Sequence, residues 1–280
     1  MTRAEALRAA AERLAAAGIE DTRGEARRLL EAAGELSPAG LIAAMAEAPT
    51  PHETARFDAL IARRAAREPL SHLLGTVGFW TLELEVTPDV LTPRPDTETV
   101  VEAALEAVSG RSAPRRILDI GAGSGAILLA LLSELPHAAG VATDISPAAL
   151  AVARSNAQRN GLVERITFVE TSWADGVDGP FDLVVSNPPY IASAVVETLE
   201  PEVKDHEPRL ALDGGPDGLG PYPHLLAEAR RLLKPGGTAV LEIGYDQGDA
   251  ALALAREAGA QAARLRQDLA GRDRALMARW

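Results

Sequence analysis

The sequence predicts an α/β protein: a doubly wound, Rossmann-like, seven-stranded sheet, preceded by a small N-terminal helical bundle and a linking β-hairpin. Three observations lead to this fold class. Roughly the first 75 residues have helical periodicity and are rich in Ala, Leu, Arg and Glu. A short stretch then alternates apolar and polar residues, as a hairpin does. From residue 115 onward, apolar runs typical of buried strands alternate with helical segments.

Composition narrows the class of protein. The 280 residues suffice for one large domain or two smaller ones. The chain has no cysteine, which excludes disulfides and thiolate metal sites, and its five histidines lack metal-ligand spacing, so we expect no metal. The net charge of −12 opposes binding to a phosphate backbone and fits a small molecule or a basic protein partner better.

The chain begins with a charged, amphipathic stretch that lacks the apolar core of a signal peptide. Its longest apolar runs, such as residues 127–132, are far too short to span a bilayer. We therefore expect a cytoplasmic enzyme.

Residues 1–75 are predicted to form a bundle of three or four short helices. Leu7, Ala11 and Leu14 fall on one face of the first helix. Ser37 precedes a proline and is a good N-cap, and the run from Thr50 to Glu53 has the pattern of a capping box. Nothing in this domain has a catalytic pattern.

Residues 76–95 are predicted to be the linking hairpin, with strands within 75–80 and 82–86 and prolines after them. The domain that follows, 96–280, starts with a helix from Asp96 or Thr97 to about Val108. The run from Ser193 to Tyr222 is long, charged and rich in Pro and Gly, so we expect a loop over the site.

The remaining elements alternate in a way that indicates a mainly parallel sheet, closed by an antiparallel hairpin at the C-terminus. The predicted strands are 115–120, 138–143, 166–170, 181–186, 237–243, 262–268 and 274–280, and the predicted helices are 124–135, 147–160, 222–234 and 247–258.

A strand, a glycine turn and a helix follow one another between Ile117 and Gly125. Glycines at such a turn let a cofactor approach the backbone, and the helix N-terminus adds free N–H donors. Gly121, Gly123 and Ala126 also satisfy the dinucleotide fingerprint, and Asp144 ends the next strand where an acid would hold ribose hydroxyls. The predicted donor site comprises Asp119, Gly121, Ala122, Gly123, Ser124, Gly125, Asp144 and Trp173.

Two observations favour a methyl donor over a dinucleotide. Asp119 would face a pyrophosphate unfavourably but could help to hold a cationic, amine-bearing ligand such as S-adenosylmethionine. A nicotinamide enzyme also has no evident use for the Asn-Pro-Pro-Tyr that ends a later strand of the same sheet. Trp173 either flanks the adenine or is a half-buried loop residue. Asp182 more plausibly caps its strand than contacts a ligand.

The tetrapeptide Asn187, Pro188, Pro189 and Tyr190 is the predicted acceptor site. The Asn187 side chain and the Pro188 carbonyl can accept the two N–H bonds of a planar NH2 group, which aims its nitrogen at a methyl group and favours the charge that develops there. Tyr190 would stack on the amide plane or exclude water. The alternative is a plain strand-terminating turn.

The sequence resembles class I S-adenosylmethionine-dependent methyltransferases and, more closely, the peptide chain release factor glutamine N5-methyltransferases of the HemK/PrmC family. The resemblance covers nearly the whole chain. The motifs that carry it are Arg67–Leu70, Leu74–Gly75, Val90–Glu98, Asp119–Gly125, Asn187–Tyr190, Glu207–Leu212, Gly214–Gly218 and Leu241–Gly244.

The resemblance implies a sheet of the methyltransferase type, S-adenosylmethionine as cofactor, and the glutamine of the Gly-Gly-Gln loop of class I release factors as substrate. It also implies that Asn187 contacts the donor and that the helical domain helps to dock the factor. Two positions depart from the family: His72 stands where Tyr is usual and Asp96 where Glu is common. We expect both to lie away from the methyl-transfer site.

Competing interpretations remain. A sister family methylates a glutamine of a large-subunit ribosomal protein, but it tends to have Pro-Arg-Ser where this chain has Pro93–Pro95. A DNA adenine-N6 methyltransferase would need a basic cleft and a flipped base, which the net charge opposes. A binding protein without catalysis would not need the complete motifs. We expect a monomer that does not bind nucleic acid directly.

The sequence leaves two residues undecided. Arg94 lies between two prolines and either contacts the substrate or the other domain, or is a surface turn arginine. Glu242 is expected at the rim near the site, where it either receives a basic loop or is paired locally.

Overall fold

The computed structural model describes residues 1–108, 113 and 115–280, which form two compact units. The first comprises Met1–Gly75 together with Glu200–His206, and the second comprises Thr76–Leu199 with Glu207–Trp280. The first unit ends at Gly75, where the sequence places the end of the helical bundle, but it also takes in a short segment from far along the chain.

The first unit is a helical bundle whose core is made by fully buried aliphatic side chains such as Leu14, Leu29, Leu30 and Ile61. Ser37 caps its helix, and Thr50 and Glu53 form the reciprocal capping box, as predicted. The helices are α1 (Arg3–Ala16), α2 (Thr22–Gly34), α3 (Pro38–Ala44), α4 (Pro51–Ala65) and the short α5 (Leu70–Leu74).

The added segment of this unit, which contains α10 (Pro201–Lys204), is held by ion pairs. Glu202 lies 2.9 Å from Nη1 of Arg64 and 2.7 Å from Nη2 of Arg67. The Arg64 side chain is 7% exposed, so its charge would be costly to bury without such partners.

The second unit is built on a seven-stranded mixed sheet with the order β5-β4-β3-β6-β7-β9-β8. The first five of these strands run parallel, whereas β9 is antiparallel to both of its neighbours, so the predicted closing hairpin is confirmed. The strands are β3 (Arg115–Ile120), β4 (Ala138–Asp144), β5 (Ile166–Glu170), β6 (Phe181–Ser186), β7 (Leu233–Glu242), β8 (Ala262–Gln267) and β9 (Asp273–Arg279).

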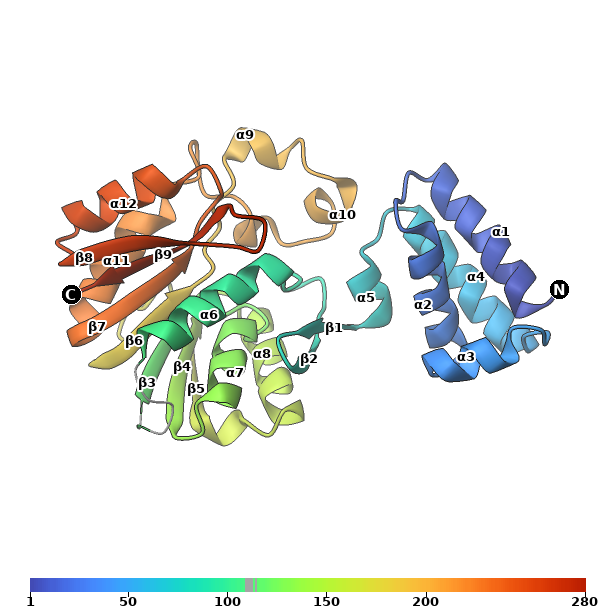
Figure 1. The fold of residues 1–280 in the computed structure, drawn as a ribbon, viewed down its shortest axis with the longest axis horizontal. Helices are drawn as coiled ribbons and strands as arrows, with labels where there is room; N and C mark the ends of the chain where they lie inside the picture. Colours follow the sequence, from blue (N-terminus) through green and yellow to red (C-terminus); the bar gives the residue numbers. More distant parts are fainter. Residues whose placement is uncertain (109–112, 114) are drawn as a thin grey trace. The chain divides into compact units, whose positions relative to one another are not determined.

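Helices cover both faces of this sheet (Figure 1). Successive residues of a strand point to opposite faces, and accordingly Ile117 and Leu118 belong to two different buried clusters. One cluster packs on α6 (Glu98–Ala107), α7 (Ala126–Glu134) and α8 (Pro147–Arg159), and the other packs on α11 (Pro221–Leu232) and α12 (Gly248–Glu257). The fold is therefore doubly wound, as the sequence predicts.

The predicted hairpin is present as β1 (Thr76–Phe79) paired with β2 (Leu82–Glu85). Two details differ from expectation. Strand β7 begins at Leu233 rather than at 237, because Leu233 pairs with Phe181 before the register shifts. The run from Ser193 to Tyr222 is not all loop, since it contains α9 (Ser193–Val196), α10, the 3₁₀ turn Arg209–Ala211 and the start of α11.

Candidate active site

The candidate site is a cavity of about 540 Å³ at the carboxyl ends of β3, β4 and β6. From β3 the chain winds outward through β4 and β5, whereas β6 and β7 lie on the other side of β3, so the strand order reverses between β3 and β6. Open α/β sheets bind ligands at this point. The lining comes from three regions: the glycine turn after β3, the ends of β4 and β6, and the segments before α6 and after α10.

The glycine turn is shaped by two residues with positive φ. Gly121 has φ 71° and Gly123 has φ 54°, values that side chains disfavour, and a Cβ added at either would meet no other atom within 4 Å. The carboxylate of Asp144 accepts hydrogen bonds from the backbone N–H of Gly123 and of Ser146, both at 2.9 Å. Asp144 therefore fixes the turn and also lines the cavity.

Trp173 lies in the wall of the same cavity. Its ring stacks on that of His224, with centroids 5.9 Å apart and planes 13° from parallel. Its φ of 52° is unusual for a large side chain, and its carbonyl accepts a 2.6 Å hydrogen bond from the hydroxyl of Thr143. The aromatic wall that the sequence suggested is thus held in place by β4.

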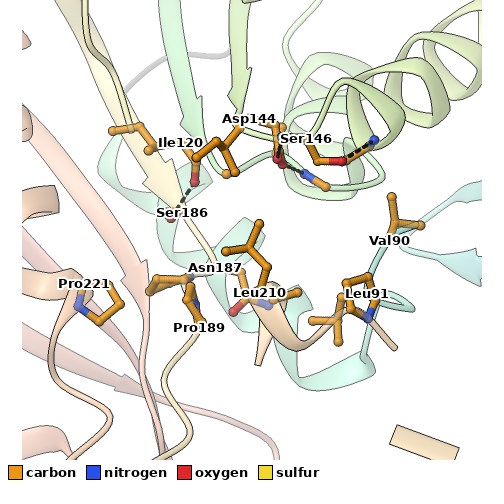
Figure 2. A pocket seen from close by; sticks show the side chains of 18 of the residues that line it. Val90, Leu91, Ile120, Asp144, Ser146, Ser186, Asn187, Pro189, Leu210 and Pro221 are labelled. Atoms are coloured by element: carbon orange, nitrogen blue, oxygen red, sulfur yellow. Dashed lines mark hydrogen bonds between the residues drawn. The ribbon is translucent and has the colours of Figure 1, made fainter. Parts of the chain in front are cut away.

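Asn187 and the two prolines after it line the part of the cavity next to β6. Ser186 ties the end of β6 to β3 by donating from its hydroxyl to the carbonyl of Ile120 at 2.6 Å. Asn187 donates from Nδ2 to Oγ1 of Thr97 at 3.3 Å. Figure 2 shows Asn187 and Pro189 on one side of the view and Asp144 and Ser146 on the other.

Not every predicted site residue lines the cavity. Asp119, Gly125 and Tyr190 are not among the residues that line it. A Cβ on Gly125 would stand 3.3 Å from Ala153, so this glycine permits close packing between α7 and α8. Tyr190 directs its hydroxyl to Oε1 of Glu242 at 3.1 Å.

Asp119 is 1% exposed, and no side chain among the described residues bonds to its carboxylate oxygens, although the backbone of Leu128 lowers the pKa of this carboxyl by hydrogen bonding. Burial, together with the charge of Asp144, raises the pKa of this carboxyl to about 7. A buried carboxyl that titrates near neutrality beside a ligand cavity is a typical functional candidate.

Four polar residues at or behind the Asn187 end of the cavity were not predicted as site residues. Arg274 is 6% exposed and forms ion pairs with Asp96 at 3.2 Å and Asp268 at 3.3 Å. Gln247 donates to the carbonyls of Tyr190 and Gly218. These groups lie on elements far apart in sequence, so no local motif predicts that they meet. The four residues that the sequence analysis missed are Thr97, Tyr222, Gln247 and Arg274.

The two residues that the sequence left open are both paired locally. Arg94 donates to Glu207 at 2.6 Å, and the same carboxylate accepts from the backbone N–H of Thr92. Glu242 is 1% exposed and therefore cannot receive a loop from outside. Asp96 forms an ion pair with Arg274 at 3.2 Å, and both residues shift the pKa of Glu242, Arg274 downward and Asp96 upward.

Among the described residues, no three His, Asp or Glu side chains are placed to hold a metal ion. Over the same part of the chain, no helix has the length and apolar composition needed to cross a membrane.

Fold and site together define a class I methyltransferase that takes its methyl group from S-adenosylmethionine. Residues 99–206 match the methyltransferase small domain, and residues 5–75 match the PrmC N-terminal domain. The chain is 46% identical to the release factor glutamine methyltransferase of Caulobacter vibrioides, over 99% of this chain and 96% of that protein. It is 48% identical to the one of Moorella thermoacetica, over 99% and 98% respectively. The chain belongs to the family of release factor glutamine methyltransferases.

Solved structures support the fold alone. A methyltransferase from Pyrococcus furiosus aligns with a TM-score of 0.52 at 20% identity, covering 79% of this chain and 96% of that one. The hMettl16 catalytic domain, solved in complex with the MAT2A 3'UTR hairpin 6, aligns with a TM-score of 0.54 at 17% identity, covering 79% and 81%.

Proposed function

We propose that this chain transfers the methyl group of S-adenosylmethionine to the side-chain amide nitrogen (N5) of the glutamine in the Gly-Gly-Gln motif of class I peptide chain release factors. One observation carries the proposal. Asn187 and Pro188, which can hold a planar amide, line the same cavity as the glycine turn and Asp144, which suit the donor. The names of the Caulobacter and Moorella relatives support this choice of substrate.

The residues present fit the donor. Gly121 and Gly123 leave the backbone open to a ligand, Asp144 can accept hydrogen bonds from ribose hydroxyls, and Trp173 offers a flat face to the adenine. Asp119 favours a cationic amine nearby, because such a charge would offset the cost of ionising its buried carboxyl. When bound, the donor supplies an activated methyl group on a sulfonium centre.

The proposed acceptor residues would make the glutamine amide nitrogen, which is a weak nucleophile, able to accept a methyl group. An amide nitrogen shares its lone pair with the carbonyl, so the site must orient it and stabilise the charge that develops on it. In the proposed step Asn187 Oδ1 and the Pro188 carbonyl accept the two N–H bonds. S-Adenosylmethionine would supply its methyl group to this nitrogen, with the thioether as leaving group, and the nitrogen would then release one proton to water.

Further proposals concern the setting of this reaction. The helical unit would help to dock the release factor, and the enzyme would act in the cytoplasm as a monomer that binds protein rather than nucleic acid. The net charge of −12 supports a basic protein surface as partner over a phosphate backbone.

Isotopically labelled methyl donor tests the proposal directly. Purified enzyme would be offered a class I release factor, its Gly-Gly-Ala variant, a large-subunit ribosomal protein and DNA. We expect label only on the unmodified factor, mapped to the glutamine by mass spectrometry. Label on the ribosomal protein or on DNA would contradict the choice of substrate and leave the methyltransferase class intact.

A further inference from the structure

Behind the acceptor end of the cavity lies a buried chain of side-chain hydrogen bonds. Asn187 Nδ2 donates to the hydroxyl oxygen of Thr97, which is 3% exposed. The Thr97 side chain in turn hydrogen-bonds to the carboxyl of Glu242, which lowers the pKa of that carboxyl against the opposing effect of burial. Glu242 also accepts from Tyr190. The carboxyl thus connects to two residues of the proposed acceptor motif.

The direction of these bonds is fixed by chemistry. An ionised carboxylate can only accept hydrogen bonds, so the hydroxyls of Thr97 and Tyr190 must both donate to Glu242. A hydroxyl has one proton, so once Thr97 has donated it, its oxygen can only accept from Asn187. The Asn187 amide therefore turns its NH2 group toward Thr97 and leaves Oδ1 for the cavity.

We propose that Glu242, acting through Thr97, is a positioning residue that sets the polarity of Asn187 so that the site presents an acceptor to a substrate NH2 group. This inference rests on the proposed function, because it explains how a glutamine amide would be chosen over a glutamate carboxylate. A carboxylate offers no N–H to Oδ1, and the two oxygens repel.

Protonation of Glu242 would reverse the chain of bonds. A neutral carboxyl needs an acceptor for its own O–H, and the hydroxyl oxygen of Thr97 is within its hydrogen-bonding reach. Thr97 would then donate its proton to Asn187 Oδ1, and the Asn187 NH2 group would face the cavity instead. That arrangement opposes the NH2 group of a glutamine and favours a carboxylate.

The surroundings of Glu242 place this change near neutral pH. Its Oε2 is buried without a partner among the described residues, and burial raises the pKa of the carboxyl to about 7. The charged and titratable groups that face it are Tyr190, Tyr222, Arg274 and Asp96, with Asp268 behind Arg274. Arg274 favours the ionised form and Asp96 opposes it.

Two substitutions at Thr97 separate polarity from packing. Thr97→Val keeps the shape of the side chain and removes the hydroxyl, whereas Thr97→Ser keeps the hydroxyl. The measurement is inhibition of methyl transfer by a release factor whose glutamine is replaced by glutamate, compared with the KM of the unaltered factor. We expect Thr97→Ser to retain the wild-type preference for glutamine over glutamate. In Thr97→Val we expect this preference to fall by at least about tenfold. Donor affinity, measured by calorimetry, should stay within about twofold in both.

Glu242→Gln tests the proposal independently, because the glutamine amide can donate as well as accept hydrogen bonds and never ionises. With saturating donor, we expect the wild-type kcat to fall as the pH is lowered through 7, since protonation reverses the relay, and we expect Glu242→Gln to lose this dependence.

Three results would overturn the relay. One is a Thr97→Val variant that equals Thr97→Ser in glutamine preference. The second is a Glu242→Gln variant that keeps the wild-type pH profile. The third, which needs no variant, is a wild-type kcat that is flat between pH 6 and 8. Absence of wild-type methyl transfer to the factor would instead refute the proposed function itself, so the two failures are distinguishable.

Discussion

The two ends of the cavity are built differently. At the proposed donor end, the site is formed mainly by the backbone of one glycine turn, in which the N–H of Gly123 is held by the carboxylate of Asp144. At the proposed acceptor end, side chains from four separate segments converge: Thr97 before α6, Asn187 after β6, Glu242 at the end of β7 and Arg274 on β9. A local backbone site can be read from a motif, whereas a site assembled from distant side chains depends on the whole fold.

This difference has an energetic side. In the proposed site, donor binding would be spread over several backbone and side-chain contacts, so losing one should reduce affinity in a graded way. The acceptor end depends on a few buried polar groups in one network, where removing one member leaves its partners unsatisfied. Substitutions at the acceptor end should therefore change turnover more than those at the donor end.

Asn187→Ala tests the comparison most severely. The variant removes the proposed acceptor of a substrate N–H bond, and loss of one such electrostatic contact typically costs about 100- to 1000-fold in kcat. We expect turnover to fall by at least that much, while donor affinity measured by calorimetry changes much less. Turnover within about tenfold of the wild type would mean that Asn187 is not the acceptor group.

Asp144→Ala should act at the other end. It removes the carboxylate that holds Gly123 and Ser146, and with it the proposed contact to ribose hydroxyls. Hydrogen bonds to a charged group contribute about 1.5–3 kcal/mol, so the Kd for the donor should rise about 10- to 100-fold. Asp175→Ala, at an exposed position outside the cavity lining, is the matched control. Equal donor affinity in the two variants would remove Asp144 from the site.

The same contrast explains what the sequence could predict. The seven strands, the C-terminal hairpin and the caps at Ser37 and Thr50 follow from local patterns, and each was recovered within a few residues. The glycine turn, Asp144 and Asn187 were placed together because the carboxyl ends of parallel strands share one edge of a sheet.

The residues behind the acceptor end could not be predicted in this way. Thr97 has the pattern of a helix start, and Glu242 is a single acid in an apolar strand; nothing local states that they meet. Their roles come from register: β6 pairs with β7, and β7 with β9, which brings Asn187, Glu242 and Arg274 to one edge. Tyr190 was expected to face the substrate, and only the structure shows its hydroxyl directed to Glu242.

Asp119 offers a pH test of the donor end. Its folded pKa of about 7 lies above the ordinary value of 3.8, so the carboxyl is neutral at acid pH, and a cationic donor would bind better once it ionises. Between pH 6 and 7.5 we expect donor affinity to rise about eightfold in the wild type and to stay nearly flat in Asp119→Asn. A parallel rise in both proteins would separate Asp119 from donor binding.

The same shift predicts the stability of the donor-free protein. A group whose folded pKa is raised stabilises the fold below its unfolded pKa, and this contribution is lost as pH rises through the folded pKa. Between about pH 4 and pH 7, Asp119 should therefore reduce the free energy of unfolding by up to about 4 kcal/mol. Glu242 also has a raised pKa and should reduce the free energy of unfolding over the same pH range. Denaturant melts of wild type and Asp119→Asn at both pH values would separate the contribution of Asp119 from that of Glu242. An identical pH dependence in the two proteins would contradict it.

Trp173 should give the smallest effect and the most direct view of the donor. Stacking between an aromatic ring and a flat ligand contributes about 1 kcal/mol, so Trp173→Leu should weaken donor binding about fivefold and Trp173→Phe less. The chain has three tryptophans, Trp80, Trp173 and Trp280, and only Trp173 lines the described cavity. Donor binding should therefore change the fluorescence of the wild type and of Trp280→Phe, but not that of Trp173→Phe. A fluorescence change that persists in Trp173→Phe would place the adenine elsewhere in the cavity and leave the glycine turn and Asp144 as the whole of the donor end.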